Sequence, residues 1–376
     1  MQKKTPLFLK ISLLLICLTI FLPLHLFAEA NSNFLISIDE LEKFIGNPES
    51  VILDCRDNNA YNLGHIPGAV TFESSSRYAL RDGTGRVKPL SEIEKIIGNA
   101  GIDNDKRVVV YSDAKDLDLA STAFWILEYL GDDKVYFLNG GITAWQEAGK
   151  SVSKERMKTI HPVKFKGKVI KSRIATTEEI VKIAKNQSAD IQLIDSRSKK
   201  EYTGEDIRSL RGGRIPNTTI NIPHEITYDK KTGKLLSEDM LASFIYKSLD
   251  KNKRTIAYCQ TGARATVTYL DMRLLGFKNP AVYDDSWVVY GNSIYPPYPI
   301  ENEQWINLDV ISKMKKTIDK LAKEVIDLKT ELSNMKVPKQ LSSVKNEASI
   351  KEEAAQLKEE SWMNPLEESG CGMAEE

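Results

Sequence analysis

Cys259 has the setting of a reactive cysteine in this sequence. The apolar run Thr255–Tyr258 predicts a short strand that ends at this cysteine, and a loop with Gly262 leads into a segment with helical apolar spacing. A helix N-terminus aims N–H groups and partial positive charge at the preceding residues, and Arg264 adds a full charge. Both features favour the thiolate, the nucleophilic form of cysteine. The alternative is a small buried side chain without reactivity.

The spacing between Cys259 and Arg264 indicates which kind of reaction the cysteine could carry out. Four residues separate them, and the loop resembles the active-site loop of rhodanese-type sulfurtransferases, which holds a cysteine persulfide. Phosphatase-like relatives in that superfamily have one residue more, which opens the loop for a phosphate. The resemblance implies that Cys259 is the nucleophile and that Arg264 binds the anionic donor. It also implies that amides surround the sulfur, those of Gln260, Thr261, Gly262, Ala263, Arg264 and Ala265.

The sequence repeats itself in two halves. Three pairs of segments carry the repeat: Val51–Arg56 with Gln192–Arg197, Gly64–Pro67 with Gly213–Pro216, and Val109–Ser112 with Ile256–Cys259. Short apolar strands alternate with helical segments in each half, which predicts a parallel α/β sheet with helices on both faces. Active groups of such sheets collect at the carboxyl ends of strands, where Cys259 is expected. The order of motifs resembles the tandem rhodanese family, which implies two rhodanese-like domains of this α/β class.

The first half lacks the features that would activate a nucleophile. Ser112 stands at the position of Cys259, and the segment Ser112–Asp118 is acidic, without a glycine or a closing arginine. Carboxylates at this place would repel an anionic substrate. A serine nucleophile also needs an adjacent base, and the sequence offers none. The first half is therefore expected to be inactive and to cover the active half, as in tandem members of the family.

Further candidates lie before and after the cysteine loop. Asp195 and Arg197 are predicted to form a structural ion pair at a strand end, with a catalytic or pocket role for Arg197 as the alternative. Trp287 is expected to be a pocket wall or a core residue. Some members of the family carry a thiosulfate-binding arginine four residues after the position of Arg197, where this chain has Glu201. Arg214 replaces the usual histidine. It is expected either to compensate at the pocket for the missing thiosulfate-binding arginine or to be a solvated charge.

The resemblance implies a thiosulfate sulfurtransferase that works through a Cys259 persulfide and passes the sulfur to cyanide or a thiol. Members that prefer mercaptopyruvate have a loop without the closing arginine, so Arg264 favours thiosulfate. The alternatives are a mercaptopyruvate or polysulfide sulfurtransferase, a phosphatase or arsenate-type reductase, and a non-catalytic module that binds anions or proteins. No cofactor is expected, and no metal site, because the four histidines are scattered.

The N-terminus predicts a secretory signal peptide over residues 1–30. Lys3 and Lys4 precede the apolar run Ile11–Leu22, and Ala28–Ala30 has the form of a cleavage site. Export to a bacterial periplasm is expected, with an uncleaved membrane anchor as the alternative. Cleavage would leave an odd number of cysteines, which does not indicate a disulfide framework.

The C-terminal part has a strict heptad pattern of apolar residues. The a positions are Ile311, Ile318, Val325 and Leu332, and the d positions are Met314, Leu321, Leu328 and Met335. This pattern predicts a coiled-coil helix and favours a parallel homodimer through residues 311–335, with a helix folded back on its own domain as the alternative.

The whole chain is thus expected to contain six parts. These are a signal peptide (1–30), an inactive rhodanese-like domain (31–150), a linker (151–172), an active rhodanese-like domain (173–300), a coiled-coil helix (305–337) and a disordered tail (338–376). The net charge of zero and the 41% share of hydrophobic residues are typical of a globular protein and give no reason to expect nucleic-acid binding.

Overall fold

The first half contains a parallel sheet with helices around it. The computed structural model describes residues 34–157, 159–188 and 190–334, and in this part of the chain the first sheet is 5-stranded, in the order β1-β5-β4-β2-β3. Its central strands are rich in valine and isoleucine because β-branched side chains suit a sheet that is buried on both faces. The elements are β1 (Leu35–Ile36), α2 (Ile38–Leu41), β2 (Ser50–Asp54), α3 (Asn58–Leu63), β3 (Val70–Thr71), α4 (Ser76–Leu80), α5 (Leu90–Asn99), β4 (Arg107–Tyr111), α6 (Leu117–Tyr129), β5 (Val135–Leu138) and α7 (Gly141–Glu147).

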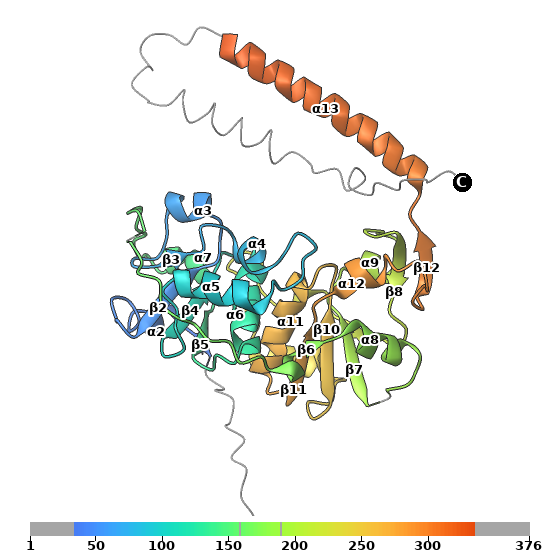
Figure 1. The fold of residues 1–376 in the computed structure, drawn as a ribbon, viewed down its shortest axis with the longest axis horizontal. Helices are drawn as coiled ribbons and strands as arrows, with labels where there is room; N and C mark the ends of the chain where they lie inside the picture. Colours follow the sequence, from blue (N-terminus) through green and yellow to red (C-terminus); the bar gives the residue numbers. More distant parts are fainter. Residues whose placement is uncertain (1–33, 158, 189, 335–376) are drawn as a thin grey trace, which may run out of the picture. The chain divides into compact units, whose positions relative to one another are not determined.

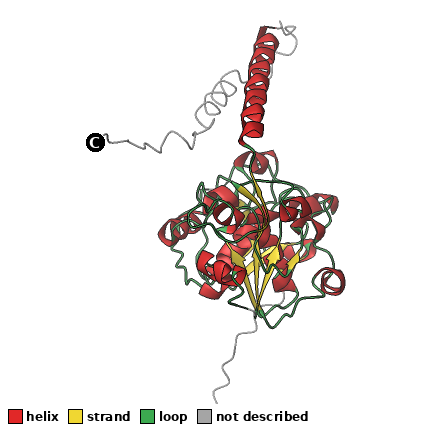
Figure 2. Ribbon diagram, turned by 90° about the vertical axis from the view of Figure 1, so that its right-hand side faces the viewer, coloured by secondary structure: helices red, strands yellow, loops and turns green. Residues whose placement is uncertain are grey.

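The second half repeats this architecture. Its 5-stranded parallel sheet has the order β6-β11-β10-β7-β9 within the described residues, and Figure 2 shows the strands surrounded by helices. The elements are the 3-10 turn η1 (Lys171–Arg173), β6 (Ile174–Ala175), α8 (Thr177–Ala184), β7 (Ile191–Asp195), α9 (Lys199–Thr203), β8 (Arg211–Arg214), β9 (Ile220–Asn221), η2 (His224–Ile226), α10 (Glu238–Met240), η3 (Leu241–Ile245), β10 (Arg254–Tyr258), α11 (Ala263–Leu274), β11 (Asn279–Tyr283) and α12 (Ser286–Tyr290). The α/β class and the internal repeat predicted from the sequence are confirmed.

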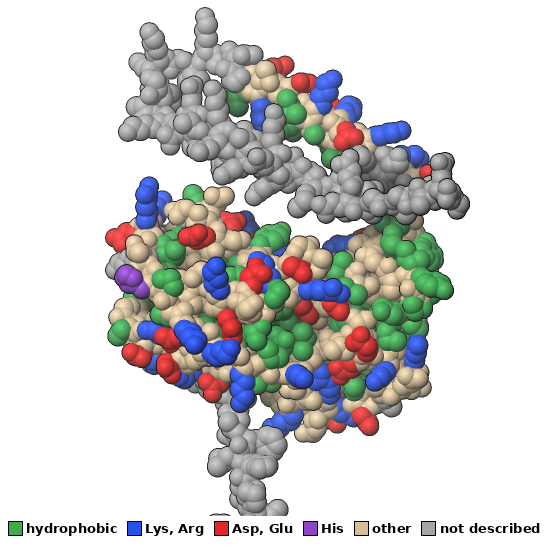
Figure 3. Space-filling model, viewed as in Figure 1, with side chains coloured by type: hydrophobic (Ala, Val, Ile, Leu, Met, Phe, Trp, Pro, Cys, Tyr) green, Lys and Arg blue, Asp and Glu red, His purple; other side chains and the backbone are tan. Residues whose placement is uncertain are grey.

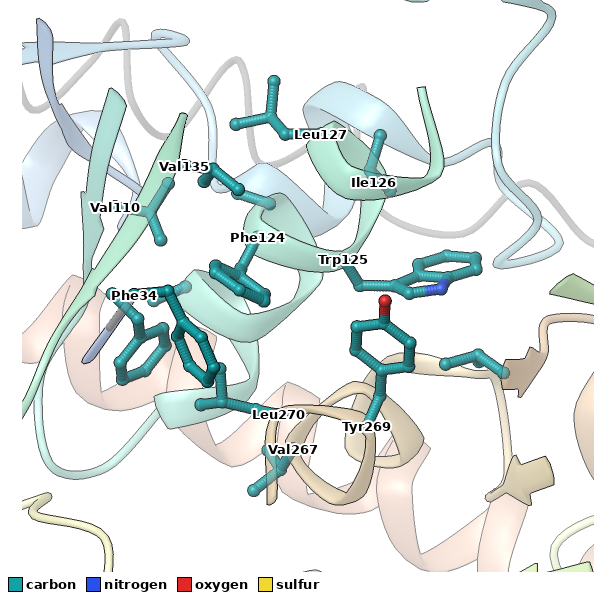
Figure 4. Close-up of a cluster of buried hydrophobic side chains, with 14 of the residues drawn as sticks. Phe34, Val110, Phe124, Trp125, Ile126, Leu127, Val135, Val267, Tyr269 and Leu270 are labelled. Atoms are coloured by element: carbon teal, nitrogen blue, oxygen red, sulfur yellow. The ribbon is translucent and has the colours of Figure 1, made fainter. Parts of the chain in front are cut away.

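Helices α6 and α11 pack against each other and join the two halves (Figure 1). Ser121 Oγ lies 2.7 Å from Thr266 Oγ1 near their N-terminal ends, and Arg273 Nη2 donates to Glu128 Oε1 at 2.8 Å near their C-terminal ends. The two helices therefore run in the same direction. Figure 4 shows apolar side chains of both helices in the core around this contact. Because the helices are parallel, the loops that precede them lie at the same end of the α6–α11 pair.

Each half also extends a hairpin onto the other half. The first hairpin is Arg81–Val87 and the second is Tyr228–Leu235, each closed by a β-bridge between its end residues. The N–H of the last residue of the first hairpin donates to Asp284 Oδ2 at 2.8 Å, and the corresponding N–H of the second hairpin donates to Asn139 Oδ1 at 2.9 Å. The two halves are thus held together by a reciprocal exchange of loops as well as by a shared core.

The C-terminal part of the described chain contains strand β12 (Glu301–Trp305), which pairs antiparallel with β8, and the helix α13 (Leu308–Asn334). Helix α13 belongs to a separate unit that begins at Asn307. Basic and acidic side chains are interspersed along this helix and over the visible face of the other unit (Figure 3). Among the described residues, no helix combines the length and the apolar character that a membrane span requires.

Two of the predicted parts lie outside the described residues. They are the signal peptide, residues 1–30, and the C-terminal tail, residues 338–376, which includes Cys371. The segment predicted as the linker, residues 151–172, contains no helix or strand in its described part before the 3-10 turn η1 begins at Lys171.

Candidate active site

Cys259 follows β10, the central strand of the second sheet. Its neighbours β7 and β11 are parallel to it, so the cysteine lies at the carboxyl edge of the sheet, as the sequence predicted. The loop of Gln260, Thr261 and Gly262 then leads into α11, and Gly262 has a φ of +86°, which favours glycine. Cys259 is 0% exposed. A donor therefore reaches the sulfur only when the side chains or the loop over it shift.

Carbonyl groups of Cys259 and the loop after it accept hydrogen bonds from residues outside the loop. Three consecutive carbonyls, starting at Cys259, accept hydrogen bonds from the N–H of Trp287 at 3.0 Å, the N–H of Val288 at 2.8 Å and Nη1 of Arg81 at 2.7 Å. The C=O and N–H of a trans peptide point in opposite directions. These three bonds therefore turn the next three N–H groups toward the opposite side of the loop.

The N–H groups of this loop are free to bind an anion. In the described part of the chain, no N–H from Gln260 to Ala265 donates a hydrogen bond to another atom of the protein. Three of them, those of Ala263, Arg264 and Ala265, belong to the first turn of α11, where N–H groups have no intrahelical partner and can be completed by a ligand. Successive free N–H groups at a helix N-terminus form a concave anion site. The predicted amide ring around Cys259 is therefore chemically available.

In the corresponding loop of the first half, main-chain N–H groups already have hydrogen-bond partners within the protein. The Asp113 carboxylate accepts from the N–H groups of Lys115 at 3.0 Å and Asp116 at 3.1 Å, and Thr143 Oγ1 accepts from the N–H of Ala114 at 3.1 Å. The protein's own oxygen atoms thus occupy the donors that an anion would need. This difference gives a physical basis for the prediction that only the second half is reactive.

Arg264 is paired with Glu201, a contact that the sequence analysis did not predict. Its two terminal nitrogens donate to the two carboxylate oxygens, each at 2.8 Å. Burial alone would raise the pKa of the Glu201 carboxyl, but the hydrogen bonds and charge of Arg264 hold this pKa at about 2. Burial lowers the pKa of Arg264, while Glu201 and the charge at Cys259 raise it by more. Both groups stay charged, so Glu201 offsets much of the positive charge beside the sulfur.

The other predicted site residues have structural contacts. Arg197 Nη2 donates to Asp195 Oδ2 at 2.6 Å, and its guanidinium carbon lies 4.0 Å from the ring centroid of Trp287, which is 1% exposed. This buried stack agrees with a structural ion pair beneath a core tryptophan. Arg214 Nη2 lies 2.7 Å from Glu301 Oε2 on β12, and none of the contacts described for it reaches the cysteine loop.

Two further residues near the loop were missed in the sequence. Arg81 comes from the first half and bonds to Thr261, and His224 lies close enough to Arg264 to respond to its charge. Burial and the positive charge of Arg264 lower the pKa of His224, whose Nδ1 has no hydrogen-bond partner among the described residues. Neither residue belongs to a local motif. Only Glu201 carried a signal, since it completes a capping box with Ser198, and that signal does not reveal its partner.

Metal-ligating side chains are not gathered in the described part of the chain. No group of three or more His, Cys, Asp or Glu residues there could hold a metal ion. A surface cavity of about 470 Å³ lies between the halves and is lined by residues that include Lys88, Thr177 and Asp285, but not by Cys259. The side chain of Cys259 is buried and does not open into this cavity.

The comparison with known proteins agrees with this architecture. A family model described as the rhodanese-like domain matches residues 37–148 and again residues 176–293. The chain belongs to the rhodanese family. This confirms the family resemblance predicted from the cysteine loop and the repeated motifs. The rhodanese-like domain is present twice, as the repeat had indicated.

Several relatives of this rhodanese-family chain span most of its two domains. A thiosulfate sulfurtransferase from Azotobacter vinelandii is 28% identical over 266 residues, which cover 70% of this chain and 94% of the relative. The sulfur carrier protein TtuD from Thermus thermophilus is 29% identical over 286 residues, 71% of this chain and 97% of the relative. A solved structure of an anaerobic ergothioneine biosynthesis enzyme from Chlorobium limicola has a TM-score of 0.63 at 24% identity and covers 72% of this chain and 70% of its own. The last likeness supports the fold.

Proposed function

We propose that this protein is a thiosulfate sulfurtransferase that carries sulfur as a persulfide on Cys259. The observation that supports this most directly is that the N–H groups from Gln260 to Ala265, which follow the cysteine at the end of β10, donate to no atom of the described residues. Those donors can stabilise the negative charge of a terminal persulfide sulfur in the way that an oxyanion hole stabilises oxygen. The relatives named thiosulfate sulfurtransferase support a sulfur-transfer reaction of this kind.

The proposed reaction is a double displacement at sulfur. The Cys259 thiolate attacks the outer sulfur of thiosulfate, a new S–S bond forms, and the S–S bond of thiosulfate breaks with its electron pair leaving on sulfite. An acceptor thiolate or cyanide then attacks the outer sulfur of the persulfide. This step yields the acceptor persulfide or thiocyanate and restores the Cys259 thiolate. The two steps need no external oxidant or reductant.

Thiosulfate is the donor that Arg264 in the cysteine loop and the named relatives favour. Arg264 and Arg208 are cations near the buried Glu201 carboxylate: Arg264 bonds to it directly, and Arg208 Nη1 lies 3.8 Å from Glu201 Oε2. Asp206 pairs with Arg208 in turn, its Oδ2 lying 2.7 Å from Arg208 Nη2, so two carboxylates balance the two guanidinium groups. The preference for thiosulfate therefore rests on Arg264 in the cysteine loop and on the relatives named thiosulfate sulfurtransferase. Mercaptopyruvate and polysulfide are the alternative donors. A module that binds an anion without chemistry is the alternative function, because free N–H groups alone do not require a reaction.

Intact-protein mass spectrometry after incubation with thiosulfate tests this function. We expect a gain of one sulfur atom, located by peptide mapping on the peptide that contains Cys259 and lost when cyanide is added, because cyanide removes only a sulfane sulfur. A gain that cyanide does not reverse, or no gain while Cys259 can still be alkylated, would exclude thiosulfate as the donor. Mercaptopyruvate and polysulfide, tested in the same way, then separate the alternative donors from the binding module.

We also propose that the protein is exported. The basis is the sequence of residues 1–30, with its basic start, apolar run and cleavage-site pattern. The same mass measurement on the chain recovered from the periplasmic fraction is expected to give the mass of a protein that begins at Asn31. A mass that includes residues 1–30, recovered with membranes, would favour the anchor instead.

Helix α13 is proposed to form a parallel two-stranded coiled coil with a second copy of the chain. The side chains of its apolar stripe, Ile318, Leu321, Val325, Leu328 and Leu332, are each 48–65% exposed. β-Branched residues at a and leucine at d favour parallel dimers. In that arrangement Glu324 at a g position faces Lys329 at the next e position of the partner helix, whereas antiparallel pairing would bring like-charged positions together.

Charge reversal on α13 is expected to weaken the dimer. In the full chain, Glu324→Lys or Lys329→Glu alone replaces two attractive interhelical pairs with repulsive ones, which should weaken association roughly tenfold. The double variant, or a mixture of the two single variants, should restore it. Sedimentation equilibrium measures each case, with Lys323→Glu on the outer face as the control. Equal association of all these variants, or a monomeric wild type, would contradict the parallel dimer.

A further inference from the structure

Arg81 reaches from the inactive half into the cysteine loop. It lies at the start of the first hairpin, and its Nη1 donates to the carbonyl oxygens of Thr261 at 2.7 Å and of Gly85 at 2.6 Å. Its Nη2 lies 2.9 Å from Asp284 Oδ1 in the second half, and its guanidinium carbon lies 5.6 Å from the ring centroid of Trp125. The side chain is 1% exposed. One buried guanidinium thus connects the first hairpin, the cysteine loop and the residue after β11.

The contact with Thr261 determines the orientation of one peptide group in the loop. Because the Thr261–Gly262 peptide is planar, holding its carbonyl toward Arg81 directs the N–H of Gly262 away from Arg81. The preceding two carbonyls are held by main-chain N–H groups at the start of α12, which belongs to the same half as the loop. The third carbonyl is the one that depends on a side chain from the other half.

The space around this contact leaves little freedom. A Cβ added at Gly262 would lie 2.6 Å from Arg81 Nη1 and 2.8 Å from the Asp284 carbonyl oxygen. A Cβ added at Gly85 would lie 3.2 Å from Thr261 Cβ. The loop is therefore closely surrounded by the guanidinium, the hairpin and the main chain after β11.

The internal repeat provides a comparison within the molecule. The second hairpin lies on the first-half loop in the same way, since a Cβ at Gly233 would lie 2.8 Å from Ala114 Cα. At the position of Arg81, however, the second hairpin has Tyr228, as the two bridge pairs show. The loop beneath the second hairpin is the one whose N–H groups donate to side chains of the first half, those of Asp113 and Thr143. Of the two hairpins, the one with an arginine at this position covers the loop with free N–H groups.

We propose that Arg81 is a positioning residue for the sulfur-transfer reaction: by holding the Thr261 carbonyl, it keeps the N–H of Gly262 available to the sulfur on Cys259. This role rests on the proposed function. It also explains what the inactive half contributes to the reaction. Arg81 does not touch the sulfur, and it acts through the peptide group that it orients.

Arg81→Lys tests this role because it keeps a positive charge beside the buried Asp284 while removing the forked donors. We expect persulfide formation on Cys259 to slow about 10- to 100-fold, the effect of misplacing one donor at a reacting centre. We also expect the pH midpoint for alkylation of Cys259 by iodoacetamide to move upward, since the thiolate loses a stabilising donor. Rapid quench with mass spectrometry measures the first quantity, and peptide-resolved alkylation measures the second.

Arg173→Lys is the matched control. Arg173 makes an ion pair with Glu128, near the opposite end of α6, so this variant weakens the contact between the halves without touching the cysteine loop. Arg81→Lys with wild-type rate and alkylation midpoint, or an equal loss in both variants, would overturn the positioning role. If the wild type takes up no sulfur, the proposed function fails, but the alkylation midpoint still decides whether Arg81 affects the thiol.

Discussion

Replacing Cys259 with serine is expected to abolish sulfur transfer, with a loss of at least about 10⁴-fold in kcat/KM. The serine oxygen cannot form the S–S bond that stores the transferred sulfur, so neither half of the cycle can proceed. The N–H groups of the loop would remain, and an anion could still bind beside the shorter hydroxyl side chain without reacting. Stopped assays of thiocyanate formation from thiosulfate and cyanide measure this loss.

The matched control is Cys55→Ser in the first half. Cys55 is also buried and follows strand β2, but burial and the charge of Asp54 raise the pKa of its thiol. We expect this variant to keep the transfer activity. Activity that survives in the Cys259 variant and disappears in the Cys55 variant would place the chemistry in the wrong half and refute the proposal.

Asp195→Ala is expected to destabilise the protein by about 3–5 kcal/mol, the typical cost of leaving a buried charge unpaired. Asp195 accepts hydrogen bonds from the Arg197 side chain and from Tyr258 Oη, each at 2.6 Å, and both members of the ion pair are buried. Removing the carboxylate leaves the buried Arg197 guanidinium beneath Trp287 without its charged partner. Urea unfolding followed by tryptophan fluorescence gives the free energy of unfolding.

Asp54→Ala provides the comparison, because the first half repeats the cluster. Arg56 donates to Asp54 Oδ2 at 2.6 Å, and Tyr111 Oη donates to the same oxygen at 2.6 Å. We expect a similar loss of stability from both variants if the cluster is structural. A variant of Asp195 that keeps its stability but loses sulfur transfer would instead make this carboxylate part of the catalytic machinery.

The parts of the fold that were predictable from sequence are those set by neighbouring residues. Alternating strands and helices indicated the α/β class, and the run before Cys259 forms β10, with the cysteine at its carboxyl end. The helix after it ends near Gly276, whose φ of +76° is the left-handed conformation typical of a residue that follows a helix. Local spacing carries this information because strand and helix periods are properties of short segments.

The contacts that shape the site were not predictable in the same way. Glu201 and Arg264 are 63 positions apart, and Arg81 and Thr261 are 180 positions apart. Neither pair belongs to one element, so no periodicity connects them. Glu201 was recognised from the family pattern as a departure from a substrate-binding arginine, but its pairing with Arg264 depends on how α9 packs beside the start of α11. Such pairs follow from tertiary packing, which a single sequence does not specify.

The exchange of hairpins changes what the linker between the domains does. Domains joined by a linker are ordinarily expected to move relative to each other. Here each domain contributes a hairpin that covers part of the other domain. The linker therefore keeps two interacting domains at a high effective concentration, as a covalent link does in a dimer. The position of the first hairpin therefore matters to the second domain whatever the chemistry of the first. A substitution that misplaces the first hairpin would therefore impair the cysteine loop of the second domain.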